Sequence, residues 1–359
     1  MNPTRGARVT LISRDPVTAY SGMIPGWIAG HYRSDEAHID LPALCASTGA
    51  RFIQATVSGV DLVNRRVLCG GSPSIGFDLL SINTGSTPRA RDIPGALEHA
   101  LRVKPIEAFV AGWEDVARHI SSLRAQPFRI AVVGGGAGGV ELTLATQHRL
   151  GELFRNAGNP AAQVEFDLVT DSPVLLPTHN ARVQAIFVRV MGERGVRVHL
   201  NHRVVRVEPG LLICEPGKAV PFDRVLWATH AEAPEWIAAS GLQTDARGFV
   251  AVHDTLQSVS HPFVFAAGDV ASVQRHPRPK SGVFAVRQGP PLAGNLRRAL
   301  AEKKLKPFVP QRHFLSLISI GDKYAVASRG SWAFEGRWAW RLKNWIDRRW
   351  MRQWPRSGF

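Results

Sequence analysis

The sequence predicts an α/β protein in which parallel sheets are covered by helices. Short β-rich runs alternate with helical patterns along the chain, an order typical of βαβ units. An apolar run before a glycine-rich turn leads directly into a helical pattern, and two stretches have the closely spaced turn residues of antiparallel meanders. With 359 residues, 45% of them apolar, the chain is long enough for two or three domains.

The expected strands follow in order along the chain. They lie at residues 8–13, 77–82, 129–133, 164–170, 196–200, 224–227 and 263–266. The meanders are expected at 57–77 and 202–222, where Asn, Gly and Pro supply the turns. A short strand follows each meander, so the same plan occurs twice, at 57–82 and again at 202–227.

Composition excludes several classes of protein. Cys45, Cys69 and Cys214 are too far apart for a disulfide framework or a zinc motif, and no metal site is expected. No signal-peptide pattern opens the sequence, and no window approaches the roughly 18 apolar residues of a spanning helix. We therefore expect a cytoplasmic protein whose membrane contact is at most peripheral, on the inner face of the membrane. The net charge of +15 predicts an anionic partner: nucleic acid, a phosphate-rich cofactor or a membrane surface.

The most specific motif is the glycine-rich turn. In RIAVVGGGAGGVELTLA, Gly134, Gly136 and Gly139 form GxGxxG between an apolar strand and a helix. Gly134 permits a tight turn, Gly136 lets backbone amides approach a pyrophosphate, and Gly139 lets the helix pack closely on the strand. The helix N-terminus adds partial positive charge. The motif predicts a nicotinamide dinucleotide site; a turn with only a packing role is the alternative.

The residue after the next strand bears on the choice of nucleotide. That strand ends at Thr170, and Asp171 follows, where an acidic side chain would hydrogen-bond the ribose 2′-hydroxyl of NADH. No Arg follows closely to hold a 2′-phosphate, so NADH is favoured over NADPH. Asp171 also fits a cap of the turn at Ser172-Pro173, and both interpretations stay open.

Three further segments carry a family resemblance. The runs TLQSVSHPFVFAAGDVA, with Gly268 and Asp269, FDLLSINTGSTP, with Gly85, and FDRVLWATHAEAP resemble the second flavin motif and the connecting strands of the pyridine nucleotide-disulfide oxidoreductase superfamily. The resemblance implies two Rossmann-like dinucleotide-binding domains, each with three layers, a parallel sheet and a β-meander. It implies FAD and NAD(P)H as cofactors, with Asp269 hydrogen-bonded to the ribityl chain of FAD.

One branch of the superfamily is the most similar. AYSGMIPGWIAGHY and KSGVFAVRQGPPLAGNLRRAL resemble the type II NADH dehydrogenase-like flavoprotein module that some bacteria carry fused to selenide, water dikinase. The resemblance implies that Ser21 and Pro25 line the flavin ring, that Gln288 contacts it, and that Glu141 lies near flavin and nicotinamide. A carboxylate stabilised by the helix N-terminus is the alternative for Glu141. The sequence has no CxxxxC pair, so electrons would pass directly to a small-molecule acceptor, with a quinone as one candidate.

The order of segments implies a domain plan. An FAD-binding domain is expected at 1–109 and 229–300, an NAD(P)H-binding domain at 110–228 and a C-terminal segment at 301–359. In the family, a strand and a GxGxxG for FAD precede the strand that is first here, so the first domain is expected to be incomplete and to bind FAD poorly. A start assigned too far downstream and a true truncation are both open explanations. A non-catalytic nucleotide-binding or membrane-associated protein is the alternative to an enzyme.

The C-terminal segment is basic and rich in tryptophan. Residues 297–359 hold 15 Lys or Arg, 4 Asp or Glu and six of the ten tryptophans. At about 100° per residue, one arc of a helix carries Trp338, Leu342, Trp345, Ile346 and Trp350, with arginines beside it. This pattern favours an interfacial helix on anionic lipid, and packing on its own domain or across a homodimer is the alternative. Nucleic acid is not expected, because no recognised binding motif occurs.

Overall fold

The chain forms two compact units, each with its own apolar core. The computed structural model describes residues 6–88, 90–103, 109, 112–113, 128–156, 164–215, 217–229 and 231–356. The first unit comprises Met1–Thr18, Asp40–Thr87 and Ala231–Arg312, and the second comprises Ala19–Ile39, Pro88–His230 and His313–Phe359. The expected start of the NAD(P)H-binding domain at residue 110 lies outside the described residues, and the expected domain boundaries stay predictions.

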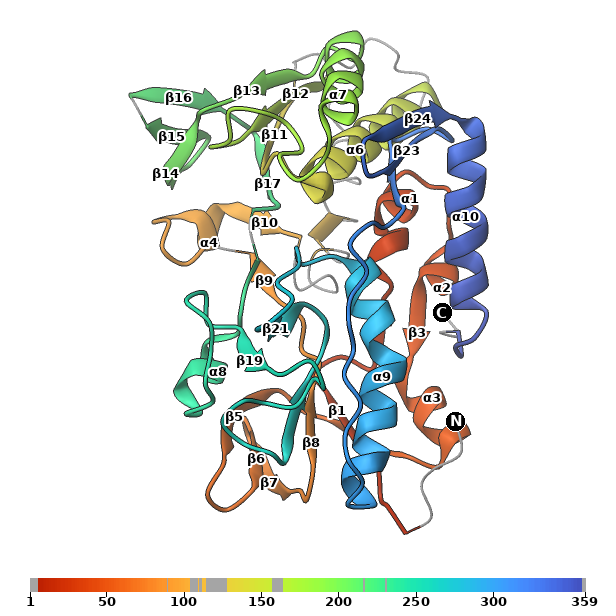
Figure 1. Cartoon of the computed structure of the whole chain (residues 1–359). Coiled ribbons are helices and arrows are strands. Elements are labelled where there is room, and N and C mark those ends of the chain that lie inside the picture. The colour runs from red at the N-terminus through yellow and green to blue at the C-terminus, as the bar shows by residue number, and fades with distance from the viewer. Residues whose placement is uncertain are drawn as a thin grey trace. The chain divides into compact units, whose positions relative to one another are not determined.

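A parallel five-stranded sheet forms the centre of the second unit (Figure 1). Its order is β10-β17-β11-β12-β13. The strands are β10 (Ala100–Arg102), β11 (Phe128–Val133), β12 (Val164–Val169), β13 (Arg197–His199) and β17 (Arg224–Trp227). In β11, Val133 is the partner of Val169 in β12 and of Trp227 in β17. The predicted parallel sheet is confirmed, and the bounds of the four strands expected in it differ by at most one residue from those expected.

The two faces of this sheet are covered differently. Successive side chains of β11 point to opposite faces. Val132 shares a core cluster with Phe187 of one covering helix, whereas Val133 shares another cluster with Leu212 of the meander. The covering elements are α6 (Ala137–Asn156) and α7 (Ala181–Glu193) on the helical face, and β14 (Arg203–Glu208), β15 (Leu211–Glu215) and β16 (Lys218–Pro221) on the meander face. The carboxyl ends of β11 and β12 remain as the edge where the glycine turn lies.

Segments from both ends of the chain complete the second unit. The α1 helix contacts α6, and α10 contacts α2 and lies on an antiparallel sheet of β22, β23 and β24 (Figure 1). The N-terminal elements are η1 (Ser21–Met23), α1 (Ile24–Ile28) and α2 (Ser34–Ala37), and the C-terminal ones are β22 (Ser316–Ser319), β23 (Ala325–Arg329), β24 (Trp332–Gly336) and α10 (Arg337–Met351). The short helix α4 (Ala96–His99) also belongs to this unit. The basic C-terminal segment is therefore helical, as predicted, from Arg337 to Met351.

The first unit consists of short parallel pairs, a meander and helices. The parallel pairs are β1 (Thr10–Ser13) with β4 (Arg51–Gln54), β8 (Leu80–Ile82) with β20 (Val264–Ala266), and β19 (Val250–Val252) with β21 (Ala271–Val273). The meander is β5 (Val57–Asp61), β6 (Arg66–Cys69) and β7 (Ser72–Gly76), and the helices are α3 (Leu41–Thr48), α8 (Glu235–Ala239), η2 (Gly268–Val270) and α9 (Gly282–Leu300). Both predicted meanders are confirmed.

Two further strand pairs lie where the chain passes from one unit to the other. They are β2 (Val17–Ala19) with β3 (His38–Asp40) and β9 (Thr87–Pro88) with β18 (Ala231–Glu232). Among the residues described above, no helix is both long enough and apolar enough to cross a membrane.

Candidate functional site

The glycine turn joins β11 to α6 at the carboxyl edge of the parallel sheet. Gly134 has φ +131°, and a Cβ there would lie 2.4 Å from the carbonyl oxygen of Ala228. A Cβ on Gly139 would lie 1.9 Å from the carbonyl oxygen of Gly134, so the helix approaches the turn as closely as backbone allows. A Cβ on Gly136, by contrast, would meet no atom within 4 Å. Close contacts within the fold therefore explain the glycines at 134 and 139, whereas the space beside Gly136 is open.

Asp171 follows β12 on the same edge and is exposed. The hydrogen bonds of its turn come from its neighbours: the Ser172 N–H donates to Thr170 Oγ1 at 3.3 Å, and Ser172 Oγ donates to the Val174 carbonyl at 2.7 Å. In the described part of the chain, no hydrogen bond joins the Asp171 carboxylate to this turn. The capping interpretation of Asp171 thus has no hydrogen bond among the described residues to support it, and the role of Asp171 stays a prediction.

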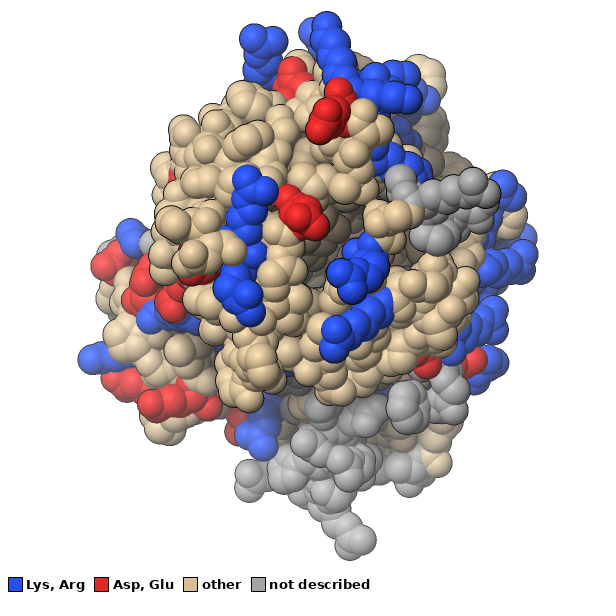
Figure 2. Space-filling view, turned by 90° about the horizontal axis from the view of Figure 1, so that it is seen from below, with Lys and Arg blue, Asp and Glu red and all other residues tan. Residues whose placement is uncertain are grey.

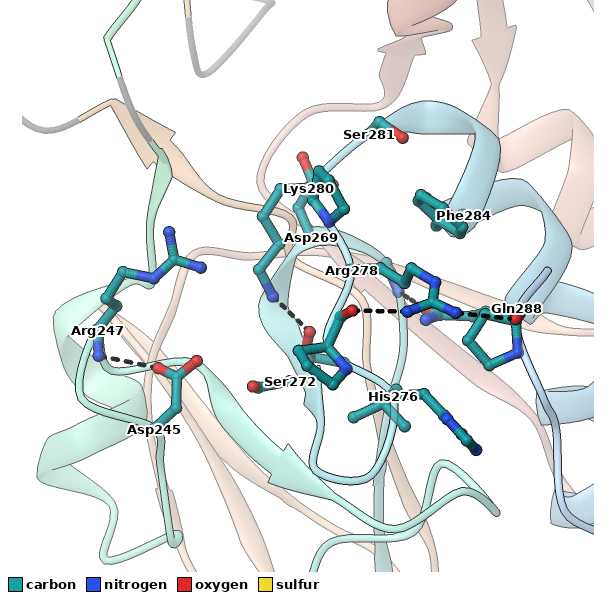
Figure 3. Close-up of a pocket in the computed structure, with 17 residues that line it drawn as sticks. Asp245, Arg247, Asp269, Ser272, His276, Arg278, Lys280, Ser281, Phe284 and Gln288 are labelled. Carbon is teal, nitrogen blue, oxygen red and sulfur yellow. Dashed lines mark hydrogen bonds between the residues drawn. The ribbon is translucent and has the colours of Figure 1, made fainter. Parts of the chain in front are cut away.

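A cavity of about 110 Å³ lies in the first unit at the start of α9 (Figure 3). Gln288 is buried, and its Oε1 accepts a hydrogen bond of 2.6 Å from the Gly268 N–H. Asp269 Oδ2 accepts one of 3.3 Å from Ser86 Oγ, one residue after Gly85. Gly85 and Gly268 both have φ +73°, which suits glycine at these turns. The structure thus brings together the four residues Gly85, Gly268, Asp269 and Gln288, and Gln288 holds the turn that carries Asp269.

Lys280 enters the same cavity beside Asp269 (Figure 3). Its Nζ donates to the Ala271 carbonyl and lies 3.9 Å from the centre of the Phe249 ring. Burial lowers the pKa of Lys280 to about 8, although Asp245 and Asp269 act in the opposite direction. Ser281 Oγ also lines the cavity, is buried, and has no hydrogen-bond partner among the described residues. These polar groups fit a ligand with hydroxyl groups, such as the ribityl chain of FAD.

A group of charged side chains lies in the second unit between α6, β22 and α10. Near the start of α6, the Glu141 carboxylate accepts hydrogen bonds from Ser319 N (2.8 Å) and Ser319 Oγ (3.0 Å). Lys343 Nζ donates to Asp347 Oδ2 (2.8 Å) and to the Gly22 carbonyl (2.6 Å). Gly22 belongs to η1, so Ser21, which is exposed, and Pro25 lie within three residues of the carbonyl that Lys343 contacts, and their roles stay predictions. We call Glu141, Ser319, Lys343, Asp347 and Tyr20 the buried charge cluster.

Burial dominates the electrostatics of this cluster. It raises the pKa of Glu141, and the Lys343 ammonium and the Ser319 donors only partly offset it. Burial lowers the pKa of Lys343, but the charges of Asp347 and Glu141 outweigh it, so the net direction is upward. Burial raises the pKa of Asp347 too, against the opposing effects of Lys343 and the Tyr20 hydroxyl. The Lys343 ammonium is thus paired with one carboxyl group, Asp347, and acts on the other, Glu141, through its charge.

Sequence reasoning missed Lys343 and Asp347, since both looked like ordinary members of a basic helix. The helix buries Ala339, Asp347 and Met351, and the Lys343 side chain on the same face is 12% exposed. The expected apolar arc instead reaches the surface: Trp338, Trp345 and Ile346 are 50%, 57% and 37% exposed. The available signal was the spacing of Lys343 and Asp347, four and eight residues after Ala339, a small residue on a strand-packed face.

The fold and the glycine turn define the class, an α/β protein of the dinucleotide-binding type. A family model described as pyridine nucleotide-disulphide oxidoreductase matches residues 2–289. The chain belongs to this family of oxidoreductase enzymes.

Relatives and solved structures agree with this assignment. The chain is 28% identical over 209 residues to the type II NADH:quinone oxidoreductase of Haemophilus influenzae, covering 54% of this chain and 47% of that protein. It is 24% identical over 251 residues to an NADH dehydrogenase-like protein of Mycobacterium tuberculosis, covering 68% and 61%. The sulfide:quinone oxidoreductase structure from Aquifex aeolicus has a TM-score of 0.79 at 18% identity, over 96% of this chain and 85% of that one, and so shares the fold. The chain spans about half to two thirds of the length of these two curated relatives.

Proposed function

We propose that this protein is an FAD-dependent oxidoreductase that takes hydride from NAD(P)H, with NADH favoured, and reduces a small-molecule acceptor of the quinone class. The observation that carries the proposal is the glycine turn between β11 and α6, where Gly134 and Gly139 are closely packed and the space beside Gly136 is open at a helix N-terminus. The family and the printed activities of the relatives support the reaction type.

The cofactors would be held by separate groups of residues. Gly134, Gly136, Gly139 and Asp171 would bind the nicotinamide nucleotide, whereas Gly85, Gly268 and Asp269 would bind FAD. FAD, when bound, supplies two-electron redox chemistry between the nicotinamide and the acceptor. Ser21 and Pro25 would line the flavin ring, with Glu141 and Gln288 near it.

Near the acceptor, the protein itself would supply a proton for the reduction. Reduction of a quinone takes up protons as well as electrons, so a group with a raised pKa beside the site is useful. The buried charge cluster provides such a group at Glu141. Cys45, Cys69 and Cys214 are buried and unpaired on different elements, which supports direct transfer to the acceptor rather than through a disulfide.

NADH oxidation with a short-chain quinone analogue, after incubation with FAD, tests the proposal. The wild type is expected to turn over when FAD is supplied in large excess, since weak FAD binding is expected. Gly136→Val is expected to weaken NADH binding by about 100-fold or more, because its side chain enters the pyrophosphate space. Gly151→Ala, in the same helix away from the turn, is the control. A wild type that binds nucleotide but oxidises no NADH would favour the non-catalytic alternative.

We also propose that the protein docks peripherally on an anionic membrane through the outer face of α10. That face and the adjoining β24 expose Trp332 (66%), Phe334 (57%), Trp338 and Trp345. Basic side chains form a nearly continuous column at the right-hand edge of the view in Figure 2, where few acidic ones occur. Aromatic side chains at headgroup depth with cations beside them are typical of interfacial helices.

Flotation with vesicles that contain an anionic lipid checks this docking proposal. The double substitution Trp338→Ser and Trp345→Ser is expected to reduce the bound fraction about tenfold, because two large apolar groups no longer enter the interface. The matched control is Val63→Ser with Val309→Ser, two exposed apolar positions of the first unit (91% and 66% exposed). Equal binding by both double variants would contradict the proposal.

A further inference from the structure

The inner face of α10 presents an ion pair to the interior of the second unit. Lys343 and Asp347 are one helical turn apart, with side chains 12% and 7% exposed, and their Nζ and Oδ2 atoms lie 2.8 Å apart. The same Nζ donates to the Gly22 carbonyl at 2.6 Å. Two donor directions of the ammonium are therefore fixed, one by the helix and one by the η1 turn.

Two phenols lie within electrostatic reach of Asp347. Burial and the Asp347 carboxylate raise the pKa values of Tyr20 and Tyr32, and the Tyr20 hydroxyl acts to lower the pKa of Asp347. At the outer end of this face, Arg348 pairs with Glu36 of α2. Among the described residues, the groups in electrostatic reach of Asp347 are Lys343, Tyr20, Tyr32 and Glu141, whereas Glu36 and Arg348 pair with each other.

Glu141 is the third charged member of the cluster. It faces Lys343 and Asp347 from α10 and the two Ser319 donors from β22. The Lys343 charge favours ionised Glu141, whereas the Asp347 charge disfavours it. A buried pair of this kind is weak evidence for stability, since well-packed apolar residues do as well or better. Because burying the Lys343–Asp347 pair costs desolvation free energy, we look for its role in holding these charges in place rather than in stability.

We propose that Asp347 is a positioning residue that holds the Lys343 ammonium at the Gly22 carbonyl and, chiefly through its own negative charge, sets the proton affinity of the Glu141 carboxyl group. This inference rests on the proposed function, in which Glu141 serves as proton donor beside the acceptor. Asp347 contacts Lys343, so it acts on Glu141 through its own negative charge and through the position of the ammonium rather than on the acceptor.

The test is the titration of Glu141 in Asp347→Asn, which keeps the shape of the side chain and removes its charge. Titration of ¹³C-labelled glutamate carboxyl groups in the ligand-free protein, assigned with Glu141→Gln, measures it directly. We expect the midpoint of Glu141 to fall by about 1 pH unit in Asp347→Asn. Tyr20→Phe, which removes one hydroxyl, is expected to shift it in the same direction by less, and it keeps the proposal testable if Asp347→Asn does not fold.

Glu36→Gln is the matched control, because Glu36 also pairs with a cation of α10 but lies outside the buried charge cluster. It should leave the Glu141 midpoint in place. The pH profile of kcat for NADH oxidation should move with the titration in Asp347→Asn. An unchanged midpoint in both Asp347→Asn and Tyr20→Phe, or an equal shift in Glu36→Gln, would overturn the proposal. A shifted midpoint in a protein without NADH oxidation would support the positioning role and reject the proposed function.

Discussion

Gly139→Ala is expected to destabilise the second unit by about 3 kcal/mol or more, the upper end of the cost of overpacking a core. The added Cβ would lie 1.9 Å from the Gly134 carbonyl oxygen and 2.9 Å from its carbonyl carbon. Both are backbone atoms of the turn, so relief requires the start of α6 to move away from β11. Urea unfolding followed by circular dichroism measures the effect, and NADH binding should be lost together with stability.

Gly138→Ala is the control one residue earlier in the same helix. A Cβ on Gly138 meets nothing within 4 Å, and alanine favours helix over glycine by about 0.5–1 kcal/mol. The two alanine substitutions should therefore change stability in opposite directions. If Gly139→Ala were as stable as Gly138→Ala, the close approach of helix and turn would not exist in solution.

The glycine turn was predictable from sequence because its causes are local. Gly134 and Gly139 are required by atoms within the motif or on a paired strand, and the strands around them are apolar runs of ordinary length. The α/β class, the parallel sheet and both meanders follow from the same local patterns, and the structure confirms them. The ends of the shorter strands did not follow: the strand expected at 77–82 begins at Leu80, because only that part pairs with β20.

The buried charge cluster was not predictable for the opposite reason. Its members meet over long separations: Ser319 is 178 residues from Glu141, and Lys343 is 321 residues from Gly22. A helical wheel ranks side chains by hydropathy, so it assigns Lys343 and Asp347 to solvent and the tryptophans to one coherent face. The small Ala339 and the carboxylate of Asp347 instead determine which face of the helix is buried, because an ammonium can be buried only where a charged or hydrogen-bonding partner is present.

Lys343→Met is expected to cost about 3–5 kcal/mol of the free energy of unfolding at pH 7.5, the usual cost of removing one partner of a buried ion pair. Methionine fills much of the same space, so the loss comes from the charges left behind: Asp347 loses its partner at 2.8 Å, and Glu141 loses the nearby cation. Lys323→Met, at an exposed lysine of the same unit, should change stability by less than about 1 kcal/mol.

The pH dependence of Lys343→Met separates lost charge from lost packing. Without the ammonium, burial raises the pKa values of Glu141 and Asp347 further above their unfolded values. The folded variant then binds more protons than its unfolded chain between those values, so its free energy of unfolding falls as pH rises. The deficit relative to the wild type should therefore shrink from pH 8 to pH 5, measured by urea unfolding at each pH. A deficit of equal size at both pH values would assign the loss to packing and reject the ion pair as its cause.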